Sequence, residues 1–207
     1  MKKEKLEPVI KQALGTNWEA LSEIVKQHYD ITPGEDTTLI LRGEMSEVYH
    51  STIAKLYLLP GRIFGALVPY RGKKIPTVVK NWTSAKNSKA MFWYRTLHFP
   101  NRPQVIFQSR MEHLAGNEII EYVKYGMGIR MALFEDNHSL VYKSLGYVLR
   151  IGRLKLPIPN WMILGNATIV ERATSDTLLH LDFEIVHPLF GKTFSYAGEF
   201  AIVNSAP

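Results

Sequence analysis

Cysteine is absent from the 207 residues of the sequence. Disulfides, thiolate metal sites and cysteine nucleophiles are therefore excluded, and the absence fits the cytoplasmic location that we expect. The sequence also lacks a glycine-rich phosphate loop, the Gly-x-Ser-x-Gly motif of a nucleophile elbow and the His-Glu-x-x-His motif of zinc peptidases. We accordingly predict no cofactor, no metal and no catalytic residue of these types.

Long uninterrupted apolar segments are lacking as well. The N-terminus, MKKEKLEPVIKQ, begins with the charges of a signal peptide, but no apolar stretch follows them. The most apolar run, residues 53–70, contains Lys55, Arg62 and two prolines, which makes it a poor spanning helix. We therefore predict neither a secretory signal nor a transmembrane helix, and a peripheral membrane contact stays open as an interaction.

Acidic residues are outnumbered, with 19 Asp and Glu against 25 Lys and Arg, so the formal net charge is +6. Such a surplus favours anionic ligands or membrane surfaces. The basic residues are scattered, and only residues 2–5 and 71–74 form clusters. This spacing is typical of solvated tails and loops rather than of a nucleic-acid-binding stripe, so we expect no nucleic-acid partner.

Chain length and a hydrophobic fraction of 46% predict one globular domain, residues 1–207. Residues 1–74 are predicted to be mainly helical with one strand. Thr16 and Glu19 form a capping-box pattern before a helix over residues 18–29. A strand is expected over residues 37–48, and Ser51 can cap a second helix over residues 51–59, followed by a short helical continuation over 62–68.

Residues 75–207 alternate between polar and apolar with a period of two and are divided by turn signals. Tight joints of this kind connect antiparallel neighbours, and a long meander closes or curls to hide its edges. We predict an α+β domain, a long antiparallel β-meander curled into a lipocalin-like or START-like barrel or deep cup, with the N-terminal helices packed against its mouth. The expected strands are 77–82, 90–97, 104–114, 118–125, 129–135, 139–150, 167–174, 177–187 and 192–203.

Residues 151–165 interrupt the meander with two prolines and a tryptophan. This composition predicts a non-strand excursion with a short helical turn after Pro159. A connection of this length is often functional, as a lid or rim. The structural alternative is a plug that covers one end of the barrel.

Strand alternation places Arg95 on one face with Trp93 and Leu97, and Glu121 on one face with Ile119 and Val123. If these faces are internal, the guanidinium must be paired, and Glu121 is a possible partner. The pair could hold the carboxylate or polar head of a ligand at the base of a cavity. The structural alternatives are a buried ion pair and two solvent-facing charges.

Two histidines receive structural interpretations. His180 alternates with Asp182 and Glu184 opposite a clean apolar face, which indicates the solvated side of a half-buried strand rather than a metal or acid–base site. His187 precedes a turn in which Pro188 and Gly191 bend the chain, so its ring is expected to satisfy a turn carbonyl unless it contacts a ligand at the barrel mouth.

Five segments, in chain order, resemble the uncharacterised bacterial family called domain of unknown function 4166: FWYRTLHF, FQSRMEH, EYVKYGMGIRMAL, GRLKLPIPNW and HPLFGKTFSYAGEF. The likeness covers the chain from about Trp18 onward. Leu97 stands where the family has an aromatic residue, and Glu121 lies one residue further from Gly126 than the family pattern has it. Family members occur alone or behind epimerase-like or dehydrogenase-like domains, and the resemblance therefore implies an oxidoreductase-like partner. The matching residues are Trp93, Arg95 and Leu97; Phe107 and Ser109; Glu121; Leu156 and Pro157; and Pro188, Gly191, Tyr196 and Gly198.

The sequence thus favours non-catalytic binding of a small, mostly apolar ligand, such as a lipid or isoprenoid, inside the barrel. One alternative is an isomerase or cyclase that uses the same cavity. Another is an interaction module for an oxidoreductase, which requires a filled barrel and an exposed apolar patch over residues 53–70. The candidate wall and rim residues are Trp93, Arg95, Ser109, Glu121, Tyr125, Trp161, His187 and Tyr196.

Overall fold

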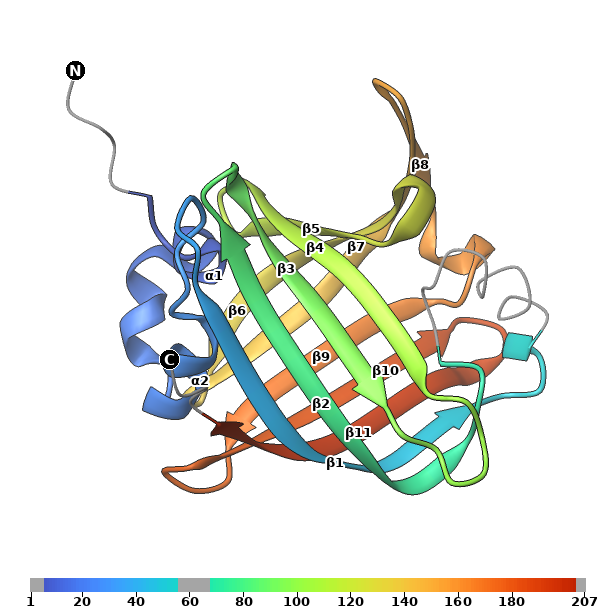
Figure 1. The fold of residues 1–207 in the computed structure, drawn as a ribbon. Coiled ribbons are helices and arrows are strands. Elements are labelled where there is room, and N and C mark those ends of the chain that lie inside the picture. Colours follow the sequence, from blue (N-terminus) through green and yellow to red (C-terminus); the bar gives the residue numbers. More distant parts are fainter. Residues whose placement is uncertain (1–5, 56–67, 204–207) are drawn as a thin grey trace.

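The computed structural model describes residues 6–55 and 68–203, and of Ser88 only the backbone. Over these residues, ten antiparallel strands form a closed barrel, and one further strand is attached to its rim (Figure 1). Each barrel strand pairs with the barrel strands that precede and follow it in the chain, and, within these residues, the further strand, β8, pairs with β7 only. The ring closes because the last strand, β11, pairs with the first, β1, and because β7 pairs with both β6 and β9. The predicted fold class is confirmed.

The barrel strands follow the predicted meander closely. Their bounds are Thr38–His50 (β1), Gly72–Ser84 (β2), Asn87–Leu97 (β3), Val105–Ala115 (β4), Glu118–Tyr122 (β5), Met127–Asp136 (β6), Ser139–Ile151 (β7), Asn166–Ala173 (β9), Leu178–His187 (β10) and Gly191–Val203 (β11). The fifth strand ends earlier than predicted, because a short 3₁₀ turn, η2 (Lys124–Gly126), follows it, and Tyr125 in this turn has a φ of 57°.

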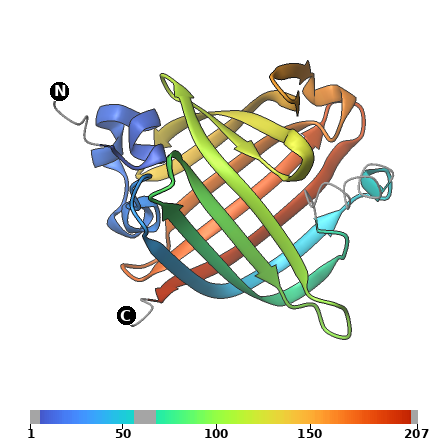
Figure 2. The same cartoon turned by 45° about the horizontal axis from the view of Figure 1, so that its top comes forward.

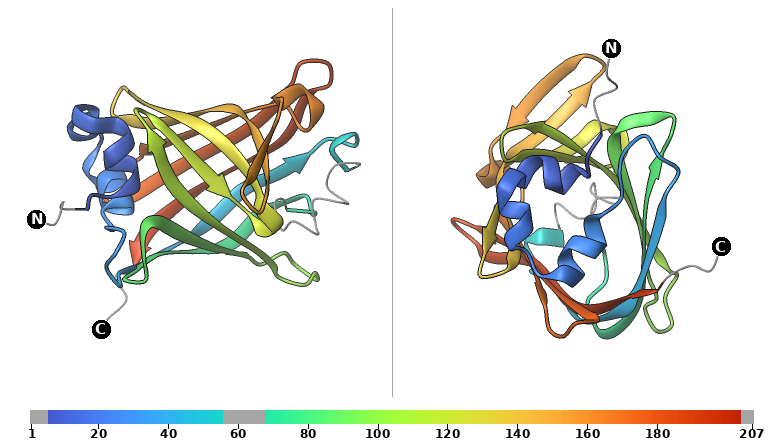
Figure 3. Two further views of the ribbon diagram at one scale, coloured as in Figure 1. Left: turned by 90° about the horizontal axis from the view of Figure 1, so that it is seen from above. Right: turned by 90° about the vertical axis from the view of Figure 1, so that its left-hand side faces the viewer.

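The N-terminal helices cover one end of the barrel, which we call the closed end (Figure 3). They are α1 (Val9–Leu14), a 3₁₀ helix η1 (Gly15–Ala20) and α2 (Glu23–Tyr29). Both α-helices bury one apolar face, α1 against β4 and β6 and α2 against β9 and β10. The predicted position of the helices across a mouth is therefore confirmed.

The single helix predicted over residues 18–29 is wrong. Leu21 and Ser22 are extended, with ψ near 149°, so the chain breaks between η1 and α2. The break allows Trp18 and Leu21, which are both buried, to pack into the core together with α2. Ahead of the break, α1 is a helix that was not predicted. The second helix was predicted over residues 51–59, with Ser51 as its cap. Ser51 Oγ accepts a hydrogen bond from the Ala54 N–H, as a cap would. The rest of this helix lies in residues 56–67, outside the described part of the chain.

The excursion predicted at residues 151–165 contains a strand, which corrects the non-strand prediction. β8 (Leu154–Ile158) pairs with the end of β7 through a turn at residues 152–153, so the hairpin projects from the rim (Figure 2). We call residues 147–158 the flap. Pro157 is accommodated because β8 pairs with β7 only and its other edge is unpaired within the described chain. The short helical turn expected after Pro159 is present as η3 (Asn160–Met162).

The end opposite the helices, which we call the open end, is formed by the connections β1–β2, β3–β4, β5–β6, β7–β9 and β10–β11. The main apolar core fills the barrel between the helices and the middle of the strands. Among the described helices, none is long and apolar enough to cross a membrane.

Candidate functional site

A cavity of about 320 Å³ lies inside the barrel on the side of the open end. Its walls are mainly apolar side chains of the strands, including Met45, Ile169 and Phe183. Val68 and Leu164, from connections at the open end, also line it. The volume is at the lower limit of the roughly 300–1,000 Å³ of small-molecule sites.

Arg95 and Glu121 are the charged residues of the described cavity lining. Nη1 and Nη2 of Arg95 both donate to Oε1 of Glu121 at 3.3 Å. Ser109 Oγ donates to the same oxygen at 2.5 Å and accepts from Arg95 Nη1 at 3.2 Å. The three side chains come from the adjacent strands β3, β4 and β5, so the alternation that places each of them inward also brings them together. The predicted partner of Arg95 is therefore confirmed.

Aromatic rings hold the Arg95 guanidinium in place. Its central carbon lies 4.2 Å from the ring centroid of Trp93 and 4.9 Å from that of Phe107. Trp93 precedes Arg95 by two residues on the same face of β3, and Phe107 on β4 is the cross-strand partner of Arg95. Such contacts fix the plane of the guanidinium and add to its electrostatic stabilisation.

A second polar cluster lies deeper, where α2 meets the barrel wall. Glu171 on β9, which is 2% exposed, accepts from Tyr29 Oη at 2.6 Å and contacts His28 Nδ1 at 3.0 Å. Tyr142 Oη donates to Tyr29 Oη at 2.6 Å. Sequence reasoning missed this cluster, although the inward alternation of Ala167, Ile169 and Glu171 carried the signal.

Burial raises the pKa of the tyrosines in this part of the barrel. Burial is the main cause for Tyr29 and Tyr142, and the charge of Glu171 adds to it, so both pKa values lie well above the usual 10. For Tyr196, which lines the cavity, burial raises the pKa to about 12. These phenols are therefore neutral hydrogen-bonding groups at physiological pH.

The eight candidate residues fall into three places. Arg95, Glu121 and Tyr196 line the cavity. Ser109 and Trp93 are buried contacts of Arg95. The other three, Tyr125, Trp161 and His187, lie at the open end outside the cavity lining. Tyr125 is 69% exposed and Trp161 is 60% exposed, whereas His187 is buried. Whether any of the eight contacts a ligand stays a prediction.

His187 performs the structural task expected of it. Its Nε2 lies 2.7 Å from the carbonyl oxygen of Trp161, and its Nδ1 accepts a hydrogen bond from the Leu189 N–H at 3.1 Å. The second bond requires an unprotonated Nδ1, so Nε2 carries the proton and donates to the carbonyl. Gly191 has the expected positive φ of 65°. The ring thus connects the β10–β11 turn to the segment after the flap.

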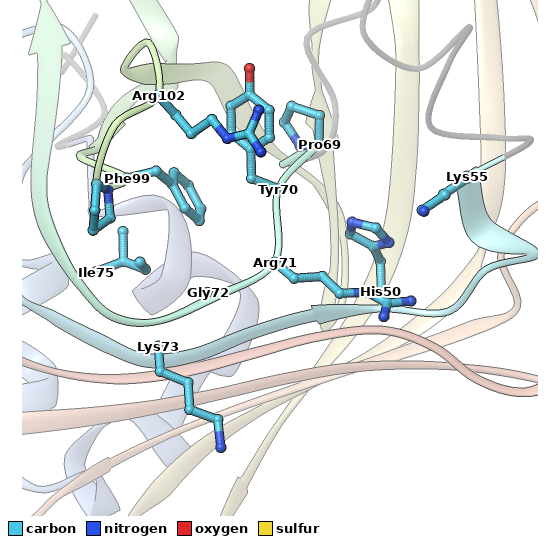
Figure 4. A pocket seen from close by; sticks show the side chains of 11 residues that line it. His50, Lys55, Pro69, Tyr70, Arg71, Gly72, Lys73, Ile75, Phe99 and Arg102 are labelled. Atoms are coloured by element: carbon cyan, nitrogen blue, oxygen red, sulfur yellow. The ribbon is translucent and has the colours of Figure 1, made fainter.

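Another hollow, of about 520 Å³, lies at the open end between residues 69–73 and 99–102 (Figure 4). Its described lining contains His50, Lys55, Arg71 and Arg102 and no carboxylate. Burial lowers the pKa of His50, and the nearby charges of Arg71 and Lys55 lower it further. The hollow is a basic feature of the rim and is distinct from the apolar cavity.

The polar face of β10 is occupied by surface ion pairs. Asp182 contacts Arg172 Nη1 at 2.6 Å and His180 Nε2 at 3.2 Å, and Glu184 contacts Lys192 at 2.6 Å. These half-exposed contacts agree with the solvated face predicted from the alternation.

No curated protein and no solved structure matches the chain. A family model does match, over residues 21–200, and its described span contains β1–β10, most of β11, the cavity and the Arg95–Glu121 pair. The chain belongs to the family described as Domain of unknown function (DUF4166).

Proposed function

We propose that the protein binds a small, mostly apolar molecule inside its barrel and holds the polar end of this molecule at the Arg95–Glu121 pair. The observation that carries the proposal is the cavity itself, whose apolar wall contains one charged pair. An interaction module with a filled barrel does not account for this space. The apolar patch that this alternative requires falls largely on residues 56–67, outside the described chain.

Because Arg95 and Glu121 carry opposite charges, the pair favours a ligand whose polar end is uncharged, such as a hydroxyl. Arg95 and Glu121 neutralise each other, and their contacts converge on Oε1 of Glu121. Within the described residues, Oε2 accepts no hydrogen bond, and neither does Arg95 Nε donate one. A hydroxyl can accept from Arg95 and donate to Glu121 simultaneously, whereas a charged head would be buried without a counter-ion.

The test compares three probes with the same alkyl chain, decan-1-ol, decanoate and decylammonium, by isothermal titration calorimetry. We expect decan-1-ol to bind most tightly. Glu121→Gln leaves Arg95 without its counter-ion, so this variant should shift the preference toward decanoate. A wild-type protein that prefers decanoate or decylammonium would contradict the uncharged head.

A matched pair of variants tests whether binding is internal. Ile169→Phe adds volume inside the cavity and should abolish decan-1-ol binding, whereas the same substitution at Ile106, which is 39% exposed on β4, should not change it. Equal loss in the two variants, or no binding by the wild-type protein, would reject the proposal.

The isomerase or cyclase alternative uses the same pair, with Oε2 of Glu121 as the base. A carrier releases its ligand unchanged. Ligand extracted from the purified protein and incubated with it again should therefore keep its retention time and fragmentation pattern in mass spectrometry, and an isomerised product would favour the enzyme.

A further inference from the structure

We propose that the open end of the barrel docks on an anionic lipid bilayer. The open end combines exposed apolar side chains with an uncompensated set of cations, and the cavity lies on this side of the barrel. The inference goes beyond ligand binding, because docking depends on the rim and not on the contents of the cavity.

Exposed apolar side chains project from separate segments of this end. Leu189 is 79% exposed at the tip of the β10–β11 turn, and Trp161 is 60% exposed in η3. Such large side chains are costly to leave in water, and aromatic ones favour the interface of a bilayer. The apolar residues that carry the argument are Leu154, Leu156, Trp161, Met162, Leu189 and Phe190.

Cations surround these side chains. The sequence has no Asp or Glu between Glu47 and Glu112, between Glu121 and Glu135, between Asp136 and Glu171, or between Glu184 and Glu199. These four stretches contain every connection of the open end. The carboxylates nearest to it on the outer face, Glu47 and Glu184, contact Lys73 and Lys192. The exposed cations that carry the argument are Arg71, Arg102, Lys124, Arg150, Arg153 and Lys155.

The closed end differs from the open end, because carboxylates accompany its cations. Its helices, turns and adjoining strand ends contain Glu19, Glu23, Glu35, Asp136 and Asp176 beside Lys11, Lys26, Lys86 and Lys89, and Lys26 contacts both Glu19 and Glu23. The charge is therefore polarised along the barrel axis, and an anionic surface would orient the molecule with its open end toward the lipid.

A bilayer fits this end better than a protein partner does. The apolar tips lie on separate projections, namely the flap, η3 and the β10–β11 turn (Figure 1), rather than on one flat patch. In the flap, Arg153 and Lys155 alternate with Leu154 and Leu156, which places charges at headgroup level beside side chains that enter the interface.

The test is cosedimentation of the full chain with two kinds of vesicle, phosphatidylcholine alone and an equimolar mixture with phosphatidylglycerol. We expect binding to the mixed vesicles that weakens with added salt. One cation near an anionic surface adds roughly fivefold to the affinity, so the double variant Arg153→Glu and Lys155→Glu should lose more than about tenfold. The matched control, Lys86→Glu and Lys89→Glu on exposed residues at the closed end, should lose far less.

A second pair of variants tests insertion of the apolar tips. Leu189→Ser with Phe190→Ser should weaken binding to the mixed vesicles with the net charge unchanged. Vesicles should shift the fluorescence of the wild-type protein to shorter wavelength. Trp161→Phe should remove this shift, because Trp18 and Trp93 are buried in the core and Trp82 lies near the closed end of the barrel, where β2 pairs with the start of β1.

Two outcomes would overturn the proposal. One is no sedimentation with mixed vesicles, which would leave the open end as a surface for a protein. The other is an equal loss for the charge reversals at the two ends, which would indicate attraction by net charge without orientation. Ile169→Phe, which blocks the cavity, should still sediment, so failure of docking and failure of ligand binding give different results.

Discussion

Single side chains in the barrel interior depend on partners from strands that are distant in the sequence. Arg95 and Glu121 are 13% and 10% exposed as side chains, and each is the principal counter-ion of the other. Removal of one member leaves a buried charge without compensation, which is more costly than removal of both.

We therefore expect Arg95→Met and Glu121→Leu each to lower the free energy of unfolding by about 3 kcal/mol. The double variant should lose much less than the sum, because it buries no unpaired charge. Urea unfolding of the four proteins measures the coupling. As a control, Arg172→Met removes one member of an ion pair that is 44% and 43% exposed, and it should cost less than about 1 kcal/mol. Additive losses at Arg95 and Glu121 would contradict the coupling.

A buried charged residue could be found from the sequence where it interrupts an otherwise apolar face of a predicted strand. Arg95 stands between Trp93 and Leu97 on an apolar face, so a partner was required, and Glu121 met the same condition. Glu171 follows Ala167 and Ile169 in the same way, but its partners His28 and Tyr29 come from a helix. Strand alternation gives no information on how a helix docks, so this cluster could not be assembled from the sequence.

The order of the hydrogen bonds around Glu171 predicts unequal effects of two similar substitutions. Tyr142→Phe removes a donor to Tyr29, and Tyr29 keeps its bond to Glu171, so about 1 kcal/mol should be lost. Tyr29→Phe leaves both Tyr142 Oη and a buried carboxylate oxygen without this partner, so about 2–3 kcal/mol should be lost. Thermal and urea unfolding compare the two variants, and an equal or reversed ranking would contradict the bonding order.

At the level of elements, the strands were predictable and two short elements were not. Alternation and turn residues identify each barrel strand, because one face packs on the core and turns separate the strands. In contrast, α1 has six residues, and Pro8 at its N-cap provides no side-chain hydrogen bond. β8 contains Pro157, which argued against a strand and is tolerated only through its edge position.

The segment after the flap is fixed to the barrel through Gly165, whose φ is 110°. A Cβ atom at this position would overlap the Val186 carbonyl oxygen and the backbone of His187. Gly165→Ala should therefore displace the segment, weaken the bond between His187 and the Trp161 carbonyl, and cost at least about 2 kcal/mol of unfolding free energy.

Gly152→Ala in the flap turn is the matched control for this substitution. Gly152 also has a positive φ, of 61°, but no atom lies within 4 Å of the position of its Cβ. Gly152→Ala should therefore cost only about 1 kcal/mol of unfolding free energy, because alanine would have to adopt a left-handed backbone conformation. Similar losses for the two variants in urea unfolding would show that the contact with β10 is not what holds the segment.

For the whole molecule, the sequence predicted a barrel or cup but not how it closes. Local turns set the pairing of successive strands, whereas the β1–β11 and β7–β9 pairings join distant segments and skip the flap. Gly198 illustrates the point. A Cβ atom at this position would overlap the Glu44 carbonyl oxygen, and the register shift opposite it, between Met45 and Glu47, belongs to the β1–β11 closure.

The interior of the closed barrel predicts a loss of stability at alkaline pH. The pKa of Tyr196 is raised to about 12 by burial, and those of Tyr29 and Tyr142 lie well above 10, whereas tyrosines of the unfolded chain titrate near 10. Above pH 10 the unfolded state binds fewer protons than the folded state, so the free energy of unfolding falls as the pH rises. Each such tyrosine contributes a slope of about 1.4 kcal/mol per pH unit up to its folded pKa.

Tyr196→Phe separates one of these contributions from the titration of surface lysines, which is common to both proteins. Between pH 10 and about 12, the variant should lose stability less steeply than the wild-type protein by about 1.4 kcal/mol per pH unit. Below pH 9 the two proteins should show the same dependence on pH, because Tyr196 is then protonated in both states. Urea unfolding followed by circular dichroism at each pH measures the slopes, and parallel curves above pH 10 would mean that the Tyr196 phenol ionises inside the folded barrel as readily as in the unfolded chain.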